Sequence, residues 1–193
     1  MKMVCIMGRS NSGKSTVEAY LEKMGFKRSI SYTTREPQVR NGKLEEDGLE
    51  YKFVNKEQFM KLVEKGKIIE YEKYGDNYYG TPRPYGSTRI VAVVCVGGYK
   101  ALKELYGEQV LGVYLKCNPE VAMHRGELRD KSAGLTSKRK EEDEELIKEM
   151  ERTADIIIDS NKDLNEMLAS ILKALKTKEE LRKWEYVQDV NRL

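Results

Sequence analysis

Residues 8–16 read GRSNSGKST and have the residue types needed to bind a nucleotide phosphate. They fit the spacing G-x-x-x-x-G-K-[ST], in which two glycines let the backbone wrap an anion and successive N–H groups face the phosphate oxygens. Lys14 would bring a positive charge to the outer phosphates, and the Ser15 hydroxyl would be a ligand for Mg²⁺. The candidate set for this loop is Gly8, Arg9, Ser10, Asn11, Ser12, Gly13, Lys14, Ser15 and Thr16. We therefore expect the segment to bind a nucleoside triphosphate.

The residues on either side of this loop favour the motif over a chance glycine-rich turn. Residues 2–7 form a short apolar run that predicts a strand. Residues 13–24 have apolar positions at helical spacing, and Gly25 follows them as a stop signal. The motif requires this order of strand, loop and helix.

The rest of the chain alternates between predicted strands and helices. Further strands are expected at 26–31, 89–96, 110–117 and 154–159, and helices at 55–66, 97–107, 119–131, 136–152 and 162–175. Three of these strands are continuously apolar, as in strands covered on both faces. Such alternation predicts an α/β fold with a parallel five-stranded sheet flanked by helices. A hairpin is also expected across Gly75 and Asp76, because a short polar turn separates two β-prone runs.

Composition narrows the possible function. Charged residues make up 35% of the 193 residues, yet the net charge is only +3, which gives little support for a nucleic-acid partner. No apolar run approaches the roughly 20 residues of a membrane span. Cys5, Cys95 and Cys117 each lie in or at the end of an apolar run, which predicts buried free thiols in a reducing cytoplasm. We therefore expect a cytoplasmic protein, either a monomer or a homodimer.

Three segments after the phosphate loop resemble the guanylate kinase family. They are SYTTREP (31–37), DGLEYKFV (47–54) and FMKLVEKGKIIEYEKYGDNYYGTP (59–82), in that order. The resemblance is close over residues 3–81 and looser to about residue 175. It implies transfer of a phosphoryl group from ATP, with Mg²⁺, to GMP or dGMP. It also implies a single kinase domain over 1–193, with a core (1–30, 83–118 and 145–193), a small β-rich monophosphate-binding subdomain (31–82) and a helical lid (119–144).

The resemblance also implies roles for individual side chains. For GMP the implied residues are Ser31, Thr34, Arg35, Arg40, Tyr51, Glu70, Tyr79 and Thr81. Ser31 and Thr81 would donate to guanine, and Glu70 would accept from its N1–H and N2–H₂ groups. The implied catalytic cations are Lys14, Arg35, Arg125, Arg129 and Arg139. The alternatives are packing on a strand face for the two tyrosines, a solvent-facing position for Glu70, and a solvated helix surface for the lid arginines.

Two departures from the family pattern leave alternatives open. Gln38 stands where a second phosphate-binding arginine is usual, so Arg40 is its candidate substitute within a long charged loop expected at 38–50. Val93 and Cys95 stand where the family has two acids on a central strand, which leaves the strictness of guanine selectivity open. The competing hypotheses are a non-catalytic guanylate-kinase-like binding module and a nucleoside monophosphate kinase with a different base preference.

Overall fold

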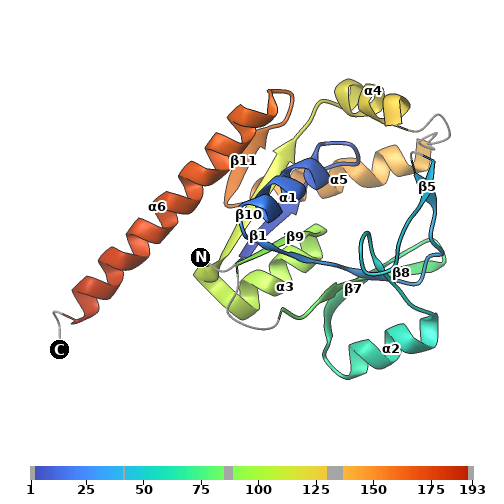
Figure 1. Cartoon of the computed structure of the whole chain (residues 1–193), viewed down its shortest axis with the longest axis horizontal. Coiled ribbons are helices and arrows are strands. Elements are labelled where there is room, and N and C mark those ends of the chain that lie inside the picture. Colours follow the sequence, from blue (N-terminus) through green and yellow to red (C-terminus); the bar gives the residue numbers. More distant parts are fainter. Residues whose placement is uncertain (1–2, 41, 85–88, 130–136, 191–193) are drawn as a thin grey trace.

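The computed structural model of the chain describes residues 3–40, 42–84, 89–129 and 137–190, apart from the side chains of residues 40, 127–143 and 178–190. A parallel five-stranded sheet forms its centre, with the strand order β11-β10-β1-β9-β2 (Figure 1). The strands are β1 (Met3–Met7), β2 (Lys27–Ser29), β9 (Ile90–Val93), β10 (Val110–Lys116) and β11 (Ile156–Asp159). The predicted parallel five-stranded sheet is therefore confirmed.

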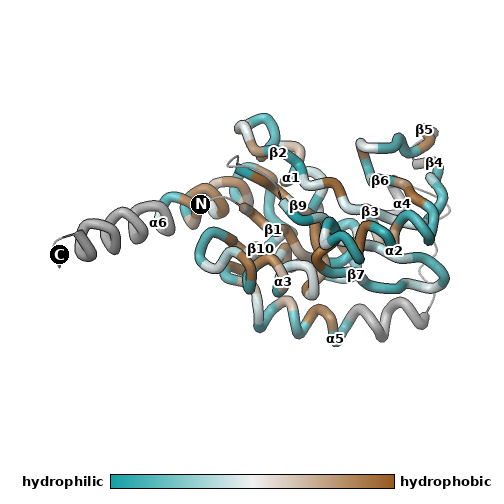
Figure 2. The backbone as a smooth tube through the Cα atoms, turned by 90° about the horizontal axis from the view of Figure 1, so that it is seen from below, coloured by the Kyte–Doolittle hydropathy of each residue, from teal (hydrophilic) through white to brown (hydrophobic). Residues whose placement is uncertain are grey.

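Helices cover both faces of this sheet because its strands are apolar on both sides. One core cluster joins the strands to α1 (Lys14–Lys23) and α6 (Leu164–Val190). A second cluster, on the other face, joins them to α3 (Val96–Tyr106) and α5 (Ser137–Thr153). Figure 2 shows the hydrophobic strands lying between these layers. The remaining helices are α2 (Lys56–Glu64), α4 (Pro119–Arg129) and the short η1 (Gly107–Gln109).

Two predicted boundaries were wrong. The strand expected over 89–96 ends at Val93, and α3 already begins at Val96. Cys95 is the N-cap of that helix, because its Sγ accepts a hydrogen bond from the Gly98 backbone N–H at 3.3 Å. The helix expected over 162–175 continues to Val190. The described residues contain no helix that is both long and apolar enough to cross a bilayer.

A smaller four-stranded sheet is built from the middle of the chain. Its order is β6-β3-β8-β7, from β3 (Tyr32–Thr33), β6 (Lys52–Phe53), β7 (Ile68–Tyr74) and β8 (Asn77–Pro82). The predicted hairpin across Gly75 and Asp76 joins β7 to β8. One face of this hairpin packs on α2 through the rings of Phe59, Tyr71 and Tyr78. Because side chains alternate between faces, Glu70, Glu72 and their cross-strand partners lie on the other face.

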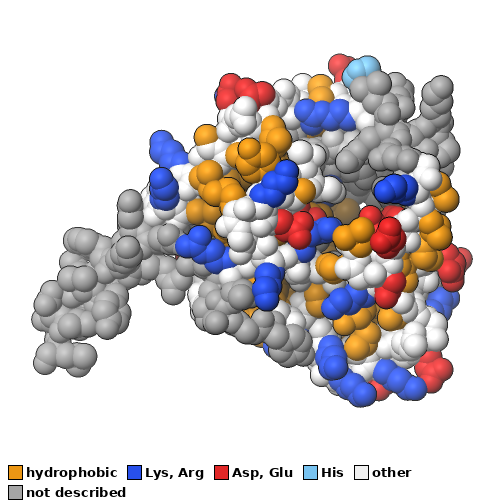
Figure 3. All heavy atoms as spheres, viewed as in Figure 1, with side chains coloured by type: hydrophobic (Ala, Val, Ile, Leu, Met, Phe, Trp, Pro, Cys, Tyr) orange, Lys and Arg blue, Asp and Glu red, His pale blue; other side chains and the backbone are white. Residues whose placement is uncertain are grey.

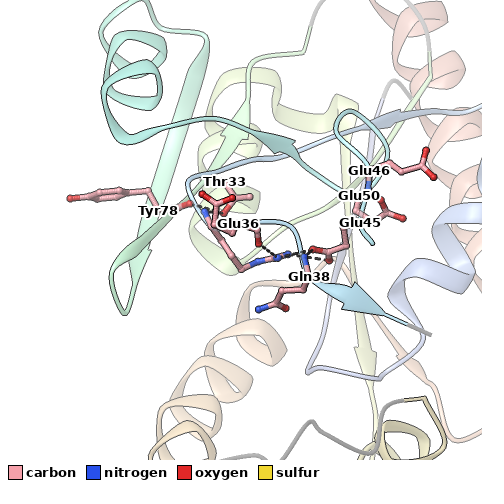
Figure 4. Close-up of polar contacts among 8 residues, drawn as sticks. Thr33, Glu36, Gln38, Glu45, Glu46, Glu50 and Tyr78 are labelled. Atoms are coloured by element: carbon pink, nitrogen blue, oxygen red, sulfur yellow. Dashed lines mark hydrogen bonds and ion pairs between the residues drawn. The ribbon is translucent and has the colours of Figure 1, made fainter. Parts of the chain in front are cut away.

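The segment expected to be a loop at 38–50 contains a two-stranded ribbon. Its strands are β4 (Val39–Arg40) and β5 (Lys43–Leu44), paired antiparallel. Glu45 closes the base of the ribbon: its backbone N–H donates to the Gln38 carbonyl at 2.9 Å, and its Oε2 accepts from the Gln38 N–H at 2.9 Å. The same carboxylate holds the Arg35 guanidinium bidentately, at 2.6 Å from Nη1 and 3.1 Å from Nη2 (Figure 4). Strand pairing, the bonds between Gln38 and Glu45 and one largely buried ion pair thus order a short stretch without periodicity.

We predict that Glu45→Ala destabilises the chain. The Arg35 and Glu45 side chains are only 10% and 3% exposed, so the truncation leaves a largely buried cation without its carboxylate. Breaking such a pair costs about 3 kcal/mol of unfolding free energy. Urea unfolding followed by circular dichroism measures this loss. Glu46→Ala, at the exposed neighbouring position, is the matched control and should change the unfolding free energy by less than about 0.5 kcal/mol. Equal effects of the two substitutions would contradict the assignment.

Candidate active site

The loop after β1 has the backbone geometry of an anion cradle. Gly8 and Gly13 adopt φ values of +152° and +93°, in the region that side chains disfavour. A Cβ on Gly8 would lie 2.6 Å from the Ser12 Oγ and 2.9 Å from the Leu115 carbonyl oxygen, so only glycine fits there. Helix α1 begins directly after the loop with no side-chain cap. The first N–H groups of the helix therefore point toward the loop, where the helix dipole favours negative charge.

Lys14 lies across the loop. Its Nζ donates to the backbone carbonyl oxygens of Gly8 and Arg9, at 2.8 and 2.7 Å. Two buried polar atoms of the loop, Ser12 Oγ and Arg9 Nε, have no hydrogen-bond partner among the described residues. Buried donors without partners are rare in folded proteins. Their presence around a lysine and a bare helix N-terminus fits an anion bound in this loop.

A cavity of about 350 Å³ adjoins this loop and extends to α6. Its lining residues are Asn11, Ser12, Gly13, Thr16, Arg125, Lys162, Leu164 and Met167. Arg125 is held at this cavity, because its Nη2 donates to the Ser160 carbonyl oxygen at 2.9 Å. Leu164 and Met167 give the cavity an apolar side next to the phosphate loop. The space thus has a polar end and an apolar end, which suits a nucleotide with its base away from the phosphates.

A second group of predicted residues gathers on the small sheet around Arg35. The Arg35 guanidinium lies 5.2 Å from the centre of the Tyr51 ring, and the Tyr51 and Tyr79 rings are 6.0 Å apart. The Arg35 backbone is fixed as well, because its N–H donates to the Thr33 Oγ1 at 3.2 Å. One cation from the segment after β3, one phenol from β8 and one from the residue before β6 can together hold an anion. The structure therefore brings these three predicted residues into one place.

A third group lies where β7 meets the first turn of α3. The Glu70 Oε2 accepts from the Thr81 Oγ1 at 3.3 Å and from the Cys95 Sγ at 3.6 Å. Burial raises the pKa of Glu70 and the nearby Glu72 carboxylate raises it further, while the hydrogen bonds from Cys95 and Thr81 lower it. Burial and the charges of Glu70 and Glu72 also raise the pKa of the Cys95 thiol. Cys95 is therefore a neutral S–H donor at pH 7. Its hydrogen bond and that of Thr81 stabilise the ionised form of Glu70, against the effects of burial and of Glu72.

The phosphate loop and the Glu70 group share one edge of the central sheet. Strands β1 and β9 are parallel neighbours, with Ile6 opposite Val93, so the phosphate loop and the start of α3 leave the sheet side by side. In open α/β sheets, ligands bind at such an edge where the strand order reverses. Figure 3 shows acidic and basic side chains around the hollow between the two sheets.

For the other predicted site residues, the structure gives little information about a role in ligand binding. The Thr34 side chain is bonded to the β7–β8 hairpin, because its Oγ1 accepts a hydrogen bond from the Tyr78 N–H at 2.9 Å. Ser31 is half-buried just before β3, and Ser10, Ser15 and Thr16 are exposed at the phosphate loop. The side chains of Arg40, Arg129 and Arg139 lie outside the described residues.

Sequence reasoning gave no role to Glu45 and Glu72, nor to three residues that line the cavity, Lys162, Leu164 and Met167. Glu45 was placed within a charged loop, and no periodicity set it apart from its acidic neighbours. Its only sequence signal is chemical, since an arginine held in a partly buried site needs a carboxylate. Glu72 shares its strand face with Glu70. The alternating pattern of this strand was also consistent with glutamates that face solvent.

Comparison with known proteins agrees with this geometry. The guanylate kinase family model matches residues 1–178. The guanylate kinase of Clostridioides difficile is 41% identical over 83 residues, which cover 42% of this chain and 38% of that protein. That of Latilactobacillus sakei is 37% identical over 118 residues, covering 60% and 54%. That of Mycoplasma mycoides is 35% identical over 158 residues, covering 76% and 48%. The chain thus spans about half the length of the curated relatives it matches.

A solved structure shows the same fold. The guanylate kinase from Anaplasma phagocytophilum superposes with a TM-score of 0.68 at 24% identity, over 92% of this chain and 85% of that one. This likeness supports the α/β architecture, with its central sheet and smaller second sheet. The sequence match extends through nearly the whole chain, and the resemblance expected from the short motifs is confirmed: this chain belongs to the guanylate kinase family.

Proposed function

We propose that the chain is a guanylate kinase, which transfers the γ-phosphoryl group of ATP to GMP or dGMP and releases ADP with GDP or dGDP. The observation that carries the proposal is the pairing of two sites at one sheet edge. One is a phosphate loop with Lys14 across it. The other combines the Glu70 carboxylate, which can accept hydrogen bonds from a base, with the Arg35 guanidinium, which can bind a phosphate.

At the donor site, ATP would place its phosphates in the loop after β1. The Lys14 ammonium would exchange carbonyl oxygens for phosphate oxygens, which are stronger acceptors because they are charged. Mg²⁺ fits the donor set, since it binds proteins through few oxygen ligands and keeps phosphates and waters for the rest. The exposed Ser15 hydroxyl at the start of α1 is its protein ligand in this proposal. When bound, the ion would neutralise charge on the β- and γ-phosphates.

At the acceptor site, Glu45 positions Arg35 and leaves part of it free for phosphate. A guanidinium has five N–H donors. Nη1 donates to Glu45 and to the Glu36 carbonyl oxygen, and Nη2 donates once to Glu45. The Nε–H and the second Nη2 proton are not used in these contacts. The phenols of Tyr51 and Tyr79 add directed donors beside them. Ser31 would donate to the guanine and Glu70 would accept from it. Thr81 has one hydroxyl proton, which it gives to Glu70 in this structure, so its hydroxyl would have to turn from Glu70 to the base in order to donate there.

The reaction itself needs alignment more than covalent help from the protein. An oxygen of the acceptor monophosphate attacks the γ-phosphorus of ATP, and the bond from that phosphorus to the β–γ bridging oxygen breaks. The phosphoryl group passes through a loose transition state that cations stabilise. In this proposal Arg125, Arg129 and Arg139, on a lid over 119–144, add to Lys14 and Arg35 and exclude water on closure. The acceptor subdomain is 31–82, and the protein acts in the cytoplasm.

The intact phosphate loop favours an enzyme over a binding module. A module that only recognises a partner has no use for a lysine and a bare helix N-terminus in a loop shaped for triphosphate. A kinase with another acceptor base is the second candidate, because Val93 and Cys95 stand where the family pattern has two acids. The acceptor assay below distinguishes all three.

We predict ATP-dependent turnover with GMP and dGMP and much less with AMP, CMP and UMP, measured by a coupled ADP-release assay. Lys14→Met should lower kcat by about 100-fold or more, because a charge that stabilises the transition state is removed. Lys23→Met, at an exposed position of α1, is the matched control and should keep wild-type kcat. The absence of turnover with every acceptor would overturn the proposed activity, and turnover on a different base would establish the second candidate.

We further predict that Glu70 gives the reaction an acid-side pH dependence. Because its pKa in the folded protein is raised, Glu70 gains a proton at a higher pH than an ordinary glutamate (about 4.3). Its acceptor function is present above the raised pKa and is lost as the pH falls through it. The value of kcat/KM for GMP, which reports the free enzyme, should therefore fall on acidification from a pH above about 4.3.

Glu70→Gln serves as the control for this pH dependence. It keeps the size of the side chain, removes the titrating group, and retains the titration of the GMP phosphate. The variant should lose about 10-fold or more in kcat/KM for GMP, in line with one lost base contact, and should lack the Glu70 limb of the profile. Identical pH profiles in wild type and variant would contradict the assignment of Glu70.

A further inference from the structure

The base end of the acceptor site contains a second carboxylate. Glu72 lies two residues after Glu70 on β7, so both side chains emerge on the same face of the strand. An oxygen of Glu70, an oxygen of Glu72 and the Cys95 Sγ all lie within 4.8 Å of one another. Glu72 is exposed while Glu70 is half-buried. Glu72 therefore lies beside Glu70 on the more exposed side of this cluster.

Glu70 alone has limited capacity for a base with several donors. Each carboxylate oxygen has two lone-pair sites, and the Oε2 of Glu70 already accepts from Thr81 and Cys95. Its Oε1 is the oxygen left for a ligand. A Cβ built on Gly97 would lie 3.0 Å from that Oε1 and 3.4 Å from the Oε1 of Glu72. The Oε1 atoms of the two glutamates thus lie near the same point at the start of α3.

The charges of this pair are not balanced within the described part of the protein. No described lysine or arginine forms an ion pair with Glu70 or Glu72. The proximity of Glu72 raises the pKa of Glu70, which means that the two carboxylates repel each other. The N-terminus of α3 offsets part of this repulsion, since helix N-termini favour anions. Two adjacent carboxylates with open oxygens are suited to a ligand edge that carries several N–H donors.

Guanine has such an edge. Its N1–H and N2–H₂ groups lie side by side, whereas hypoxanthine has the N1–H and lacks the amino group. We propose that Glu72 is a specificity-determining residue that accepts a hydrogen bond from the exocyclic amino group of the acceptor base, beside Glu70. This inference rests on the proposed kinase function. It assigns a second base-reading carboxylate to β7, in a chain where Val93 and Cys95 stand in place of the two acids of the family pattern.

The test compares GMP with inosine monophosphate (IMP), which differs from GMP only by the amino group. We measure kcat/KM for both acceptors in wild type, Glu72→Ala and Glu72→Gln. Glu72→Ala should lower the GMP-to-IMP ratio by about 5- to 100-fold, the range for one good base contact. The kcat/KM for IMP should stay within about twofold of the wild-type value, because IMP lacks the amino group that Glu72 would bind. Glu72→Gln keeps a carbonyl acceptor and should lose less.

Controls separate this role from a structural one. Glu64→Ala removes an exposed glutamate on α2 of the same region and should leave the ratio unchanged. Thermal unfolding of each variant reports whether Glu72 only stabilises α3. If Glu72→Ala lowers kcat/KM equally for GMP and IMP, or leaves their ratio unchanged in an active enzyme, the inference is wrong while the kinase function stands. If the wild type phosphorylates neither GMP nor IMP, the kinase function is wrong and the inference fails with it.

Discussion

The close approach of the β7–β8 hairpin to the first turn of α3 joins the two sheets of this protein. A Cβ on Gly98 would lie 2.5 Å from the Thr81 Oγ1 and 3.2 Å from the Glu70 Oε2. Two successive glycines at the start of α3 therefore let the small sheet dock where β9 ends. Because β9 is the parallel neighbour of β1, the same contact sets the Glu70 group beside the phosphate loop. The distance between this group and the phosphate loop thus depends on the small size of residues 97 and 98.

The charges along the site change sign from one end to the other. Under the proposed function, Lys14 and Arg35 bind phosphates, and Glu70 and Glu72 bind the acceptor base. A nucleoside monophosphate has the matching asymmetry, with an anionic phosphate and a base edge of N–H donors. Each charge at the cationic end is held by oxygen acceptors of the protein, which are the Gly8 and Arg9 carbonyls for Lys14 and the Glu45 carboxylate for Arg35. Glu70 and Glu72 have no cationic partner among the described residues. A ligand with N–H donors would therefore relieve more unfavourable charge at this end.

Much of this arrangement could be predicted from the sequence, and the misses have physical causes. Strongly apolar runs and the motif spacing predicted the central sheet and the phosphate loop. The hairpin predicted across Gly75 and Asp76 is confirmed, and its register sets Glu70 opposite Thr81. The ribbon at 39–44 was missed because its strands are two residues long, too short to show an alternating pattern. Its order comes from the side chain of Glu45, a tertiary contact that local propensity cannot reveal.

The misplaced start of α3 explains how Cys95 functions in place of an acid. The apolar run continues through VVCV, so periodicity alone extends the strand, but the thiol caps the helix through the Gly98 N–H. A carboxylate at position 95 would be the third acid within a few ångströms of Glu70 and Glu72 and would add to their repulsion. The thiol stays neutral, because burial and those two charges raise its pKa, and it donates to the Glu70 Oε2. An acid on β7 and a neutral donor at the start of α3 are therefore compatible with each other. Among the described residues, Glu70 and Glu72 on β7 are the carboxylates that lie beside this thiol.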